Sequence, residues 1–250
     1  MKKEVLNKIK VAVCVSGKFK SARDLIKSNN DILKDKFLGA DFYYATWDYY
    51  KDCFYKIFPD YNCFYFNEPN IEYHPYKDIS PQSYISSRFK ESFKYIKNKK
   101  DKNGLEWSAH HTKQIIIHSW LVDSIINKYD IVVRTRFDAR IWKDADFTPY
   151  INDSYVNQRA IGFATTRHKM FDVIYESDKT SGWLLDQLII YPAGFINKKD
   201  VEILNANRIL HPAEMGWYQV LSMPYGSNHR NVHGWVNHDR SIPENFIIQE

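Results

Sequence analysis

Two arginines and one carboxylate directly follow the most apolar short segment of the chain. Residues 131–133 read Ile-Val-Val, a β-branched run typical of a strand that is buried on both faces. Arg134, Arg136 and Asp138 come next, at alternate positions. Alternate residues of an extended segment point the same way, so we expect these side chains on one face at the strand end. Two guanidiniums beside a carboxylate suit a ligand with phosphates and a metal, although an Arg–Asp ion pair closing the strand end explains the same pattern.

A second candidate binding element is the turn that follows the first predicted strand, residues 10–16. Ser16, Gly17 and Lys18 form a short glycine turn, and Arg23 stands early in the helix predicted for residues 21–37. Hydroxyl, ammonium and guanidinium donors near a helix N-terminus favour phosphate or the edge of a base. The alternative is a surface turn that happens to carry a lysine.

The predicted strand 40–48 ends in an aromatic and an acidic residue. Trp47 could lie against a base, and Asp48 could accept a hydrogen bond from a ribose or a base. The alternative is a strand end whose aromatic ring packs under the following helix.

The elements that hold these residues alternate between strand and helix. Further strands are predicted at 62–66, 161–165 and 188–191, with a helix at 107–128 and a loop at 139–157. This alternation predicts an α/β fold with a mostly parallel central sheet flanked by helices. In such sheets ligands bind at the carboxyl ends of the strands, which is where the polar residues fall.

The segment YDIVVRTRFD, residues 129–138, resembles the strand and acidic motif of GT-A-type glycosyltransferases, particularly the small bacterial and viral enzymes that build polysaccharides. In that family an Asp-x-Asp motif holds a divalent cation against the diphosphate of a nucleotide-sugar. Here the triplet is Arg136-Phe137-Asp138, so only the last acid matches. The resemblance implies a single GT-A-like, Rossmann-related domain with Mn²⁺ or Mg²⁺ at Asp138. It also implies that the donor nucleotide contacts the residues named at the strand ends: Ser16, Gly17, Lys18, Arg23, Trp47, Asp48, Arg134 and Arg136.

Later segments carry candidates for the chemistry at the acceptor. Asp186 stands among apolar residues, where a carboxylate is costly unless it is paired or used. The resemblance implies that Asp186 activates the acceptor hydroxyl; capping a turn or pairing with an arginine is the alternative. The resemblance also implies that Trp183, His211 and Glu214 bind substrate, although Glu214 could instead cap a helix.

Composition narrows the remaining classes. The chain has 250 residues, a formal charge of +5 and three cysteines without a CxxC pair, which favours a reducing, cytoplasmic location. The turn at Gly17 has neither the GxGxxG nor the Walker spacing, which disfavours dinucleotide oxidoreductases and P-loop enzymes. The basic residues form no continuous stripe, so nucleic acid is not expected as a partner. Residues 70–106 read as a lid or irregular insertion with possible peripheral membrane contact, and 222–250 as a tail over the site.

The sequence therefore predicts a glycosyltransferase that moves a sugar from a nucleotide-diphosphate donor to a hydroxyl of a glycan or glycolipid. Two alternatives stay open. One is a non-catalytic carbohydrate- or nucleotide-binding protein on the same fold, favoured by the missing first aspartate of the acidic motif. The other is a metal-dependent phosphohydrolase that uses Asp138 with histidines of the tail.

Overall fold

The fold comes from a computed structural model of the chain. It describes residues 9–19, 23–71, 102–141, 145–163, 187–206, 217, 220–221, 231–233 and 247–248. Residues 164–186, most of the predicted lid at 70–106 and most of the predicted tail at 222–250 lie outside these ranges.

A seven-stranded sheet forms the centre of the molecule, in the order β3-β2-β1-β4-β7-β6-β8. Its strands are β1 Val11–Ser16, β2 Asp41–Trp47, β3 Cys63–Phe66, β4 Ile131–Thr135, β6 Arg159–Phe163, β7 Leu188–Pro192 and β8 Asn231–His233. Every pairing is parallel except the two made by β7, which runs antiparallel between β4 and β6. The predicted α/β class with a mostly parallel central sheet between helices is confirmed.

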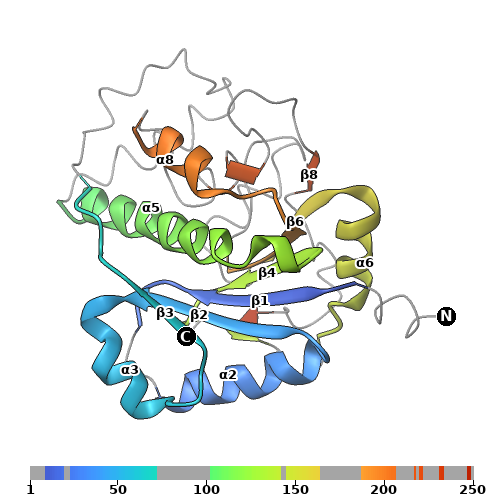
Figure 1. Cartoon of the computed structure of the whole chain (residues 1–250), viewed down its shortest axis with the longest axis horizontal. Helices are drawn as coiled ribbons and strands as arrows, with labels where there is room; N and C mark the ends of the chain where they lie inside the picture. The colour runs from blue at the N-terminus through green and yellow to red at the C-terminus, as the bar shows by residue number, and fades with distance from the viewer. Residues whose placement is uncertain are drawn as a thin grey trace.

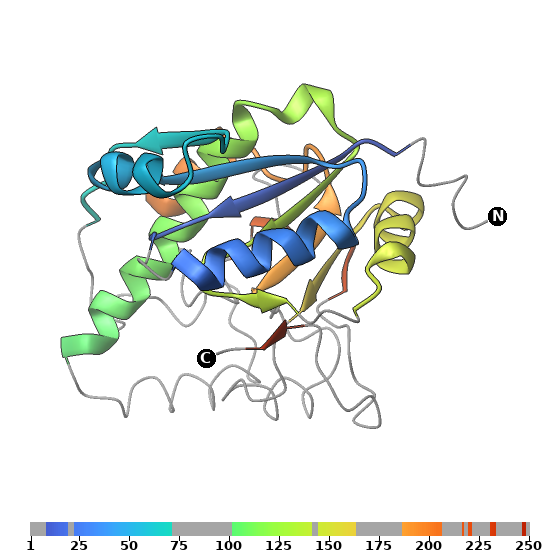
Figure 2. The same ribbon diagram turned by 90° about the horizontal axis from the view of Figure 1, so that it is seen from below.

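Helices cover both faces of this sheet (Figure 1). Helices α5 Lys102–Asp123 and α8 Lys198–Ala206 lie on one face, and α2 Arg23–Lys36 with α3 Lys51–Ile57 lies on the other. Figure 2 shows α2 and α6 Thr148–Asn157 lying along the same face. A short 3₁₀ turn, η1 Asp48–Tyr50, follows β2, and another, η3 Ile126–Lys128, precedes β4.

Strand residues divide between two cores because successive side chains of a strand point to opposite faces. Val13 and Val133 belong to the core beneath α2 and α3, whereas Ala12 and Val132 belong to the core beneath α5 and α8. Residues 131–135 are all buried, as expected for a strand covered on both faces. Even-numbered residues near the ends of β1 and β4 therefore point toward α5.

Three expectations need correction. The predicted loop at 139–157 contains β5 Arg140–Ile141 and helix α6. Only Ile151 and Ser154 of α6 are buried, so the helix has no regular apolar face that its sequence could reveal. The strand predicted at 161–165 begins and ends two residues earlier, as β6. The extended segment ends at Thr135 instead of running to Asp138, because a turn closes with the amide of Ala139 donating to the carbonyl of Arg136 (3.3 Å).

The end of the chain returns to the neighbourhood of β4. Strand β9 Ile247–Ile248 pairs antiparallel with β5, which follows β4 by five residues. Within the described ranges, no helix is both long enough and apolar enough to cross a bilayer.

Candidate functional site

The order of the strands reverses between β1 and β4. The chain places β2 and β3 on one side of β1 and then returns to place β4 on the other side. In open α/β sheets ligands bind in the crevice outside the carboxyl ends of the two strands at such a reversal, so we expect a ligand at this edge. Ser16 ends β1 and Thr135 ends β4, so the predicted donor residues at both strand ends meet at this edge.

Gly17 makes the turn after β1 possible. Its φ of +134° is a backbone conformation that residues with a Cβ rarely adopt. Its amide donates to the carbonyl of Ala45 (3.1 Å), and the amide of Phe19 donates to the hydroxyl of Thr46 (3.3 Å). The turn is thus tied to β2, and Lys18 between these two amides is exposed.

The Ser16 side chain points into the core instead of toward a ligand. Its hydroxyl lies 3.1 Å from Nδ1 of His118 on α5, and both side chains are fully buried. Of the donors predicted on this turn, Lys18 is exposed, whereas the side chain of Arg23 lies outside the described residues. The contact of Ser16 with a donor nucleotide therefore has no support in the structure.

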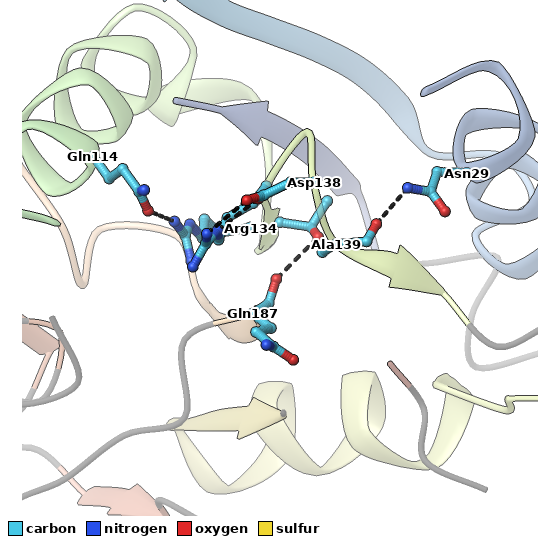
Figure 3. A network of polar contacts seen from close by, with 8 residues as sticks. Asn29, Gln114, Arg134, Asp138, Ala139 and Gln187 are labelled. Carbon is cyan, nitrogen blue, oxygen red and sulfur yellow. Dashed lines mark hydrogen bonds and ion pairs between the residues drawn. The ribbon is translucent and has the colours of Figure 1, made fainter. Parts of the chain in front are cut away.

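Arg134 is also enclosed by the layer of α5. It is fully buried, its Nη2 donates to Oε1 of Gln114 (3.0 Å), and its guanidinium lies 4.5 Å from the centre of the Trp217 ring. Figure 3 shows the Gln114 side chain reaching from α5 to this arginine. A planar guanidinium suits this combination of a fixed hydrogen bond and a stacked ring. Arg134 contributes positive charge from beneath the edge and presents no surface to a ligand.

Arg136 and Asp138 form a two-point ion pair. Nε and Nη2 of Arg136 each donate to one carboxylate oxygen of Asp138, both at 2.8 Å. The side chains are 18% and 30% exposed, so the pair borders the edge. Just behind it, Asn29 of α2 donates to the carbonyl of Ala139 and accepts from the amide of Ile141 (3.3 Å) (Figure 3). The ion-pair interpretation of the sequence pattern matches this geometry.

The surroundings of Asp138 do not fit a divalent cation. Mg²⁺ and Mn²⁺ require several oxygen ligands with lone pairs directed at the ion, and both oxygens of Asp138 accept from Arg136. Among the described residues no three His, Cys, Asp or Glu side chains come close enough together to hold a metal. Asp138 as a metal ligand thus stays a sequence-based prediction, and no step below passes through a metal.

The end of β2 exposes a tyrosine where the sequence indicated a tryptophan. Trp47 is only 3% exposed and packs edge-to-face against Trp120 of α5 (6.4 Å between ring centres). The ring is therefore packed, as in the alternative interpretation, but under α5 and not under the helix that follows β2. Asp48 is exposed, and one of its carboxylate oxygens accepts from the amide of Tyr49 (2.8 Å). The ring of Tyr49 is 56% exposed. Trp47 therefore cannot present a face to a base, whereas Tyr49 can.

Tyr49 is held in place from two sides. Its ring centre lies 4.4 Å from that of Tyr50, which in turn contacts Phe19 of the β1 turn edge-to-face (6.0 Å). Desolvation first, and then a hydrogen bond to Glu68, raise the pKa of Tyr49. Glu68 forms an ion pair with Lys113 of α5 (2.8 Å). The exposed ring is therefore connected to the turn that carries Lys18.

The described residues that flank positions 164–186 lie at this same edge. The amide of Gln187 donates to the carbonyl of Phe163 (3.2 Å), and the hydroxyl of Thr135 donates to the carbonyl of Gln187 (3.0 Å). Gln187 therefore lies beside the end of β4, and Phe163 lies next to Gln187. Asp186, Trp183, His211 and Glu214 are themselves outside the described residues, so their predicted roles remain predictions.

Two contributors were undervalued or missed at the level of sequence. Tyr49 gave no signal because the preceding tryptophan is the more conspicuous aromatic residue, and only burial separates the two. His118 and Gln114 lie four residues apart on α5, a spacing that puts both side chains on one face of the helix. From this face Gln114 accepts from Arg134 and His118 contacts Ser16.

No protein-family profile matches this chain, and no curated protein matches it in sequence. Solved structures with a similar course of the chain include core-mannan synthase A from Aspergillus fumigatus in an Mn/GDP form, at 11% identity and a TM-score of 0.37 over 87% of this chain and 67% of that one. A 4-diphosphocytidyl-2C-methyl-D-erythritol synthase from Anaerococcus prevotii shares 9% identity, with a TM-score of 0.40 over 90% and 87% of the two chains. A mannosyltransferase from S. cerevisiae shares 13% identity, with a TM-score of 0.38 over 84% of this chain and 62% of that one. This chain thus spans about two thirds of the first protein and less of the third.

Proposed function

We propose that this protein is a glycosyltransferase that moves a sugar from a nucleoside-diphosphate donor to a hydroxyl of a glycan or glycolipid. One observation carries the proposal. The glycine turn with exposed Lys18, the exposed ring of Tyr49 and the Arg136–Asp138 pair all stand at the carboxyl edge of the sheet, at or beside the crevice between β1 and β4. The resemblance of residues 129–138 to GT-A enzymes supports the same class.

The leaving diphosphate would be stabilised by fixed positive charge. Lys18 supplies an exposed ammonium group, Arg136 a guanidinium held in one orientation by Asp138, and Arg134 a buried charge beneath the edge. Preorganised charge at the position where negative charge develops is usually the largest catalytic contribution in such reactions. In this proposal Asp138 positions Arg136.

The base of the donor would lie on the face of Tyr49. A nucleotide needs an aromatic or apolar surface about one sugar away from its phosphates, and Tyr49 is linked to the Lys18 turn through the contact between Tyr50 and Phe19. Stacking of a base on an aromatic ring contributes about 1–3 kcal/mol. Asp48, directly before Tyr49, offers carboxylate oxygens to ribose or base donors.

For an inverting reaction we propose Asp186 as the general base. The acceptor oxygen forms a bond to the anomeric carbon while the bond from that carbon to the diphosphate oxygen breaks, and the electron pair leaves with the diphosphate. The proton of the acceptor hydroxyl passes to Asp186. Removal of such a base typically costs about 10²–10⁴-fold in rate. For a retaining reaction, Asp186 would orient the sugar instead. Trp183, His211 and Glu214 are proposed to bind the substrate.

The experiment that tests the function is a release assay with UDP-, GDP-, CMP- and dTDP-sugars, with and without added glycan acceptors. We expect one donor class to release nucleotide faster when an acceptor is present, and Lys18→Ala to reduce that rate. The matched control is Lys128→Ala, an exposed lysine in η3, just before the amino end of β4, and it should retain the wild-type rate. Equal rates in both lysine variants would contradict the proposed site.

A second candidate, a non-catalytic binding protein for the same nucleotide-sugars, is favoured by one observation: both oxygens of the single acidic residue that matches the motif are engaged by Arg136. This candidate predicts that a donor binds without nucleotide release under any acceptor condition. The assay above separates it from the enzyme.

A further inference from the structure

Three fully buried polar side chains from three elements form a continuous hydrogen-bonded chain beneath the crevice. Ser16 at the end of β1 lies 3.1 Å from Nδ1 of His118 on α5, and Nε2 of His118 lies 2.6 Å from the hydroxyl of Tyr191 on β7. Buried polar groups need partners, and a network that satisfies all of its members makes a local structure rigid. Both ring nitrogens of His118 are used, so its orientation is fixed.

The electrostatic surroundings keep His118 neutral. Burial, and then the charge of Arg134, lower the pKa of His118 well below its ordinary value. Among the described residues, Cys14, which is also fully buried, lies near Tyr191 at one end of this chain. A neutral imidazole has one N–H donor and one acceptor nitrogen, and a hydroxyl can donate or accept, so a neutral His118 can bond to both hydroxyls.

A serine beside a histidine is also the arrangement that activates a nucleophile. Here no substrate atom can reach it, because Ser16, His118 and Tyr191 have no exposed surface. The chain therefore acts on geometry and takes no part in bond making.

The geometry that it controls is that of the Gly17 turn. Ser16 immediately precedes Gly17, whose φ of +134° is open to glycine, but a glycine has many other backbone conformations open to it as well, so contacts have to select this one. Gln114, four residues before His118 on α5, lies 3.7 Å from the position a Cβ would take on Gly17 and also accepts from Arg134. Helix α5 thus contacts the turn with two side chains on one face.

We propose that His118 is a positioning residue: through Ser16 it fixes the Gly17–Lys18 turn in the conformation that receives the phosphates of the donor. The part that concerns phosphates rests on the proposed function, whereas the part that concerns the turn does not. A histidine that only fills the core would stabilise the whole fold without a specific effect on the turn.

Two substitutions of His118 separate its two hydrogen bonds. The amide of asparagine lies as many bonds from Cα as Nδ1 does, and the amide of glutamine as many as Nε2. His118→Asn should therefore keep the bond to Ser16 and lose the one to Tyr191, whereas His118→Gln should do the reverse. Ser16→Ala removes the bond to the turn by deleting a single oxygen, so it keeps the test available if either histidine variant fails to fold.

The readout is amide hydrogen exchange at Gly17 and Phe19, both of which donate hydrogen bonds in the turn, measured without ligand and compared with amides of β4. We expect His118→Gln and Ser16→Ala to accelerate exchange at these two amides about fivefold relative to β4, the equivalent of one hydrogen bond of about 1 kcal/mol. His118→Asn should stay close to wild type. Dissociation constants for UDP and GDP should change in the same pattern.

Equal acceleration at the turn and in β4 in every variant would show a core residue without a positioning role and would overturn the inference. If wild-type protein binds no nucleotide while the exchange pattern holds, the proposed function fails and the inference about the turn stands.

Discussion

The carboxyl ends of β1 and β4 lie side by side, yet they use their polar residues in opposite ways. At the end of β1 the serine turns into the core, the glycine shapes the backbone and Lys18 remains exposed. At the end of β4, which carries more charge, Arg134 is buried against Gln114 and Arg136 is paired with Asp138. The end with fewer charged residues is the one that carries an exposed charge, whereas the charged side chains that follow β4 are buried or only partly exposed.

This difference shows that residue types at a strand end do not by themselves say which charges a ligand can contact. The layer above the sheet decides it. Even-numbered residues of β4 face α5, so Arg134 is enclosed by Gln114 and Trp217, whereas Lys18 lies past the last strand residue. Substitution of Arg134 should therefore affect mainly the stability of the fold, and substitution of Lys18 mainly ligand binding.

The largest effect is expected at Arg134. Arg134→Ala should lower the free energy of unfolding by about 3–5 kcal/mol, because it leaves a cavity in the core and removes the donor to the partly buried Gln114. Arg134→Lys keeps the charge but loses the planar fork and the stacking on Trp217, and should recover only part of the loss. Urea unfolding measures both. A loss below about 1 kcal/mol for the alanine variant would mean that Arg134 is not part of the core.

The second largest effect is expected for Gly17→Ala. The positive φ at this position should cost about 1–3 kcal/mol of stability, and the distorted turn should also weaken nucleotide binding. Gly39→Ala is the matched control, because Gly39 also has a positive φ, +82°, with no atom near its Cβ position. Gly39 precedes the amino end of β2 and so lies at the opposite end of that strand from the carboxyl edge. The control should lose stability and keep its affinity for nucleotides; an equal loss of affinity in both variants would contradict a specific role of the Gly17 turn in binding.

His118 should make the fold sensitive to acid. Its pKa is lowered in the folded state, so as the pH falls below about 6.5 the unfolded chain gains a proton that the folded chain does not. The free energy of unfolding should then fall by up to about 1.4 kcal/mol per pH unit. Above about pH 6.5 His118 is neutral in both states, so the full stability is present there. Urea unfolding of wild type and His118→Asn at pH 7.5, 6 and 5 measures the difference. Identical pH dependence in both proteins would refute this assignment of the acid sensitivity.

The smallest effect is expected for the Arg136–Asp138 pair. Both side chains are partly exposed, so a double-mutant cycle with Arg136→Ala and Asp138→Asn should give a coupling energy of only about 0.2–1 kcal/mol. Because Asp138 is engaged by Arg136, Asp138→Asn should change donor affinity equally with and without Mn²⁺. Tighter donor binding in Mn²⁺ that Asp138→Asn abolishes would instead identify Asp138 as a metal ligand.

The sheet was largely predictable because its signals are local. β-branched runs mark β1 and β4, and the strand-helix alternation places parallel strands around them. The antiparallel direction of β7 cannot be read from its own residues, since Leu188–Pro192 is buried on both faces, as are the parallel strands of the sheet centre such as β4. Helix α6 was missed because packing of Ile151, and not a regular apolar face, holds it to the sheet.

The candidate site was predictable in place but less so in detail. Polar residues at strand ends marked the correct edge. The burial of Ser16 and Trp47, however, depends on contacts with α5: Ser16 contacts His118, which lies 102 residues further along the chain, and Trp47 contacts Trp120. The exposure of Tyr49 follows from the same packing. Such long-range contacts cannot be read from a single segment.

The most direct test of the account is hydrogen exchange with and without a saturating nucleoside diphosphate, with UDP and GDP tested separately. The account predicts slower exchange at residues 16–19 and 48–50 and near the end of β4, with no change at the amino edge around Lys128 and Gly39. Protection confined to any other part of the molecule, or protection that persists unchanged in Lys18→Ala, would contradict the assignment of this edge as the donor site.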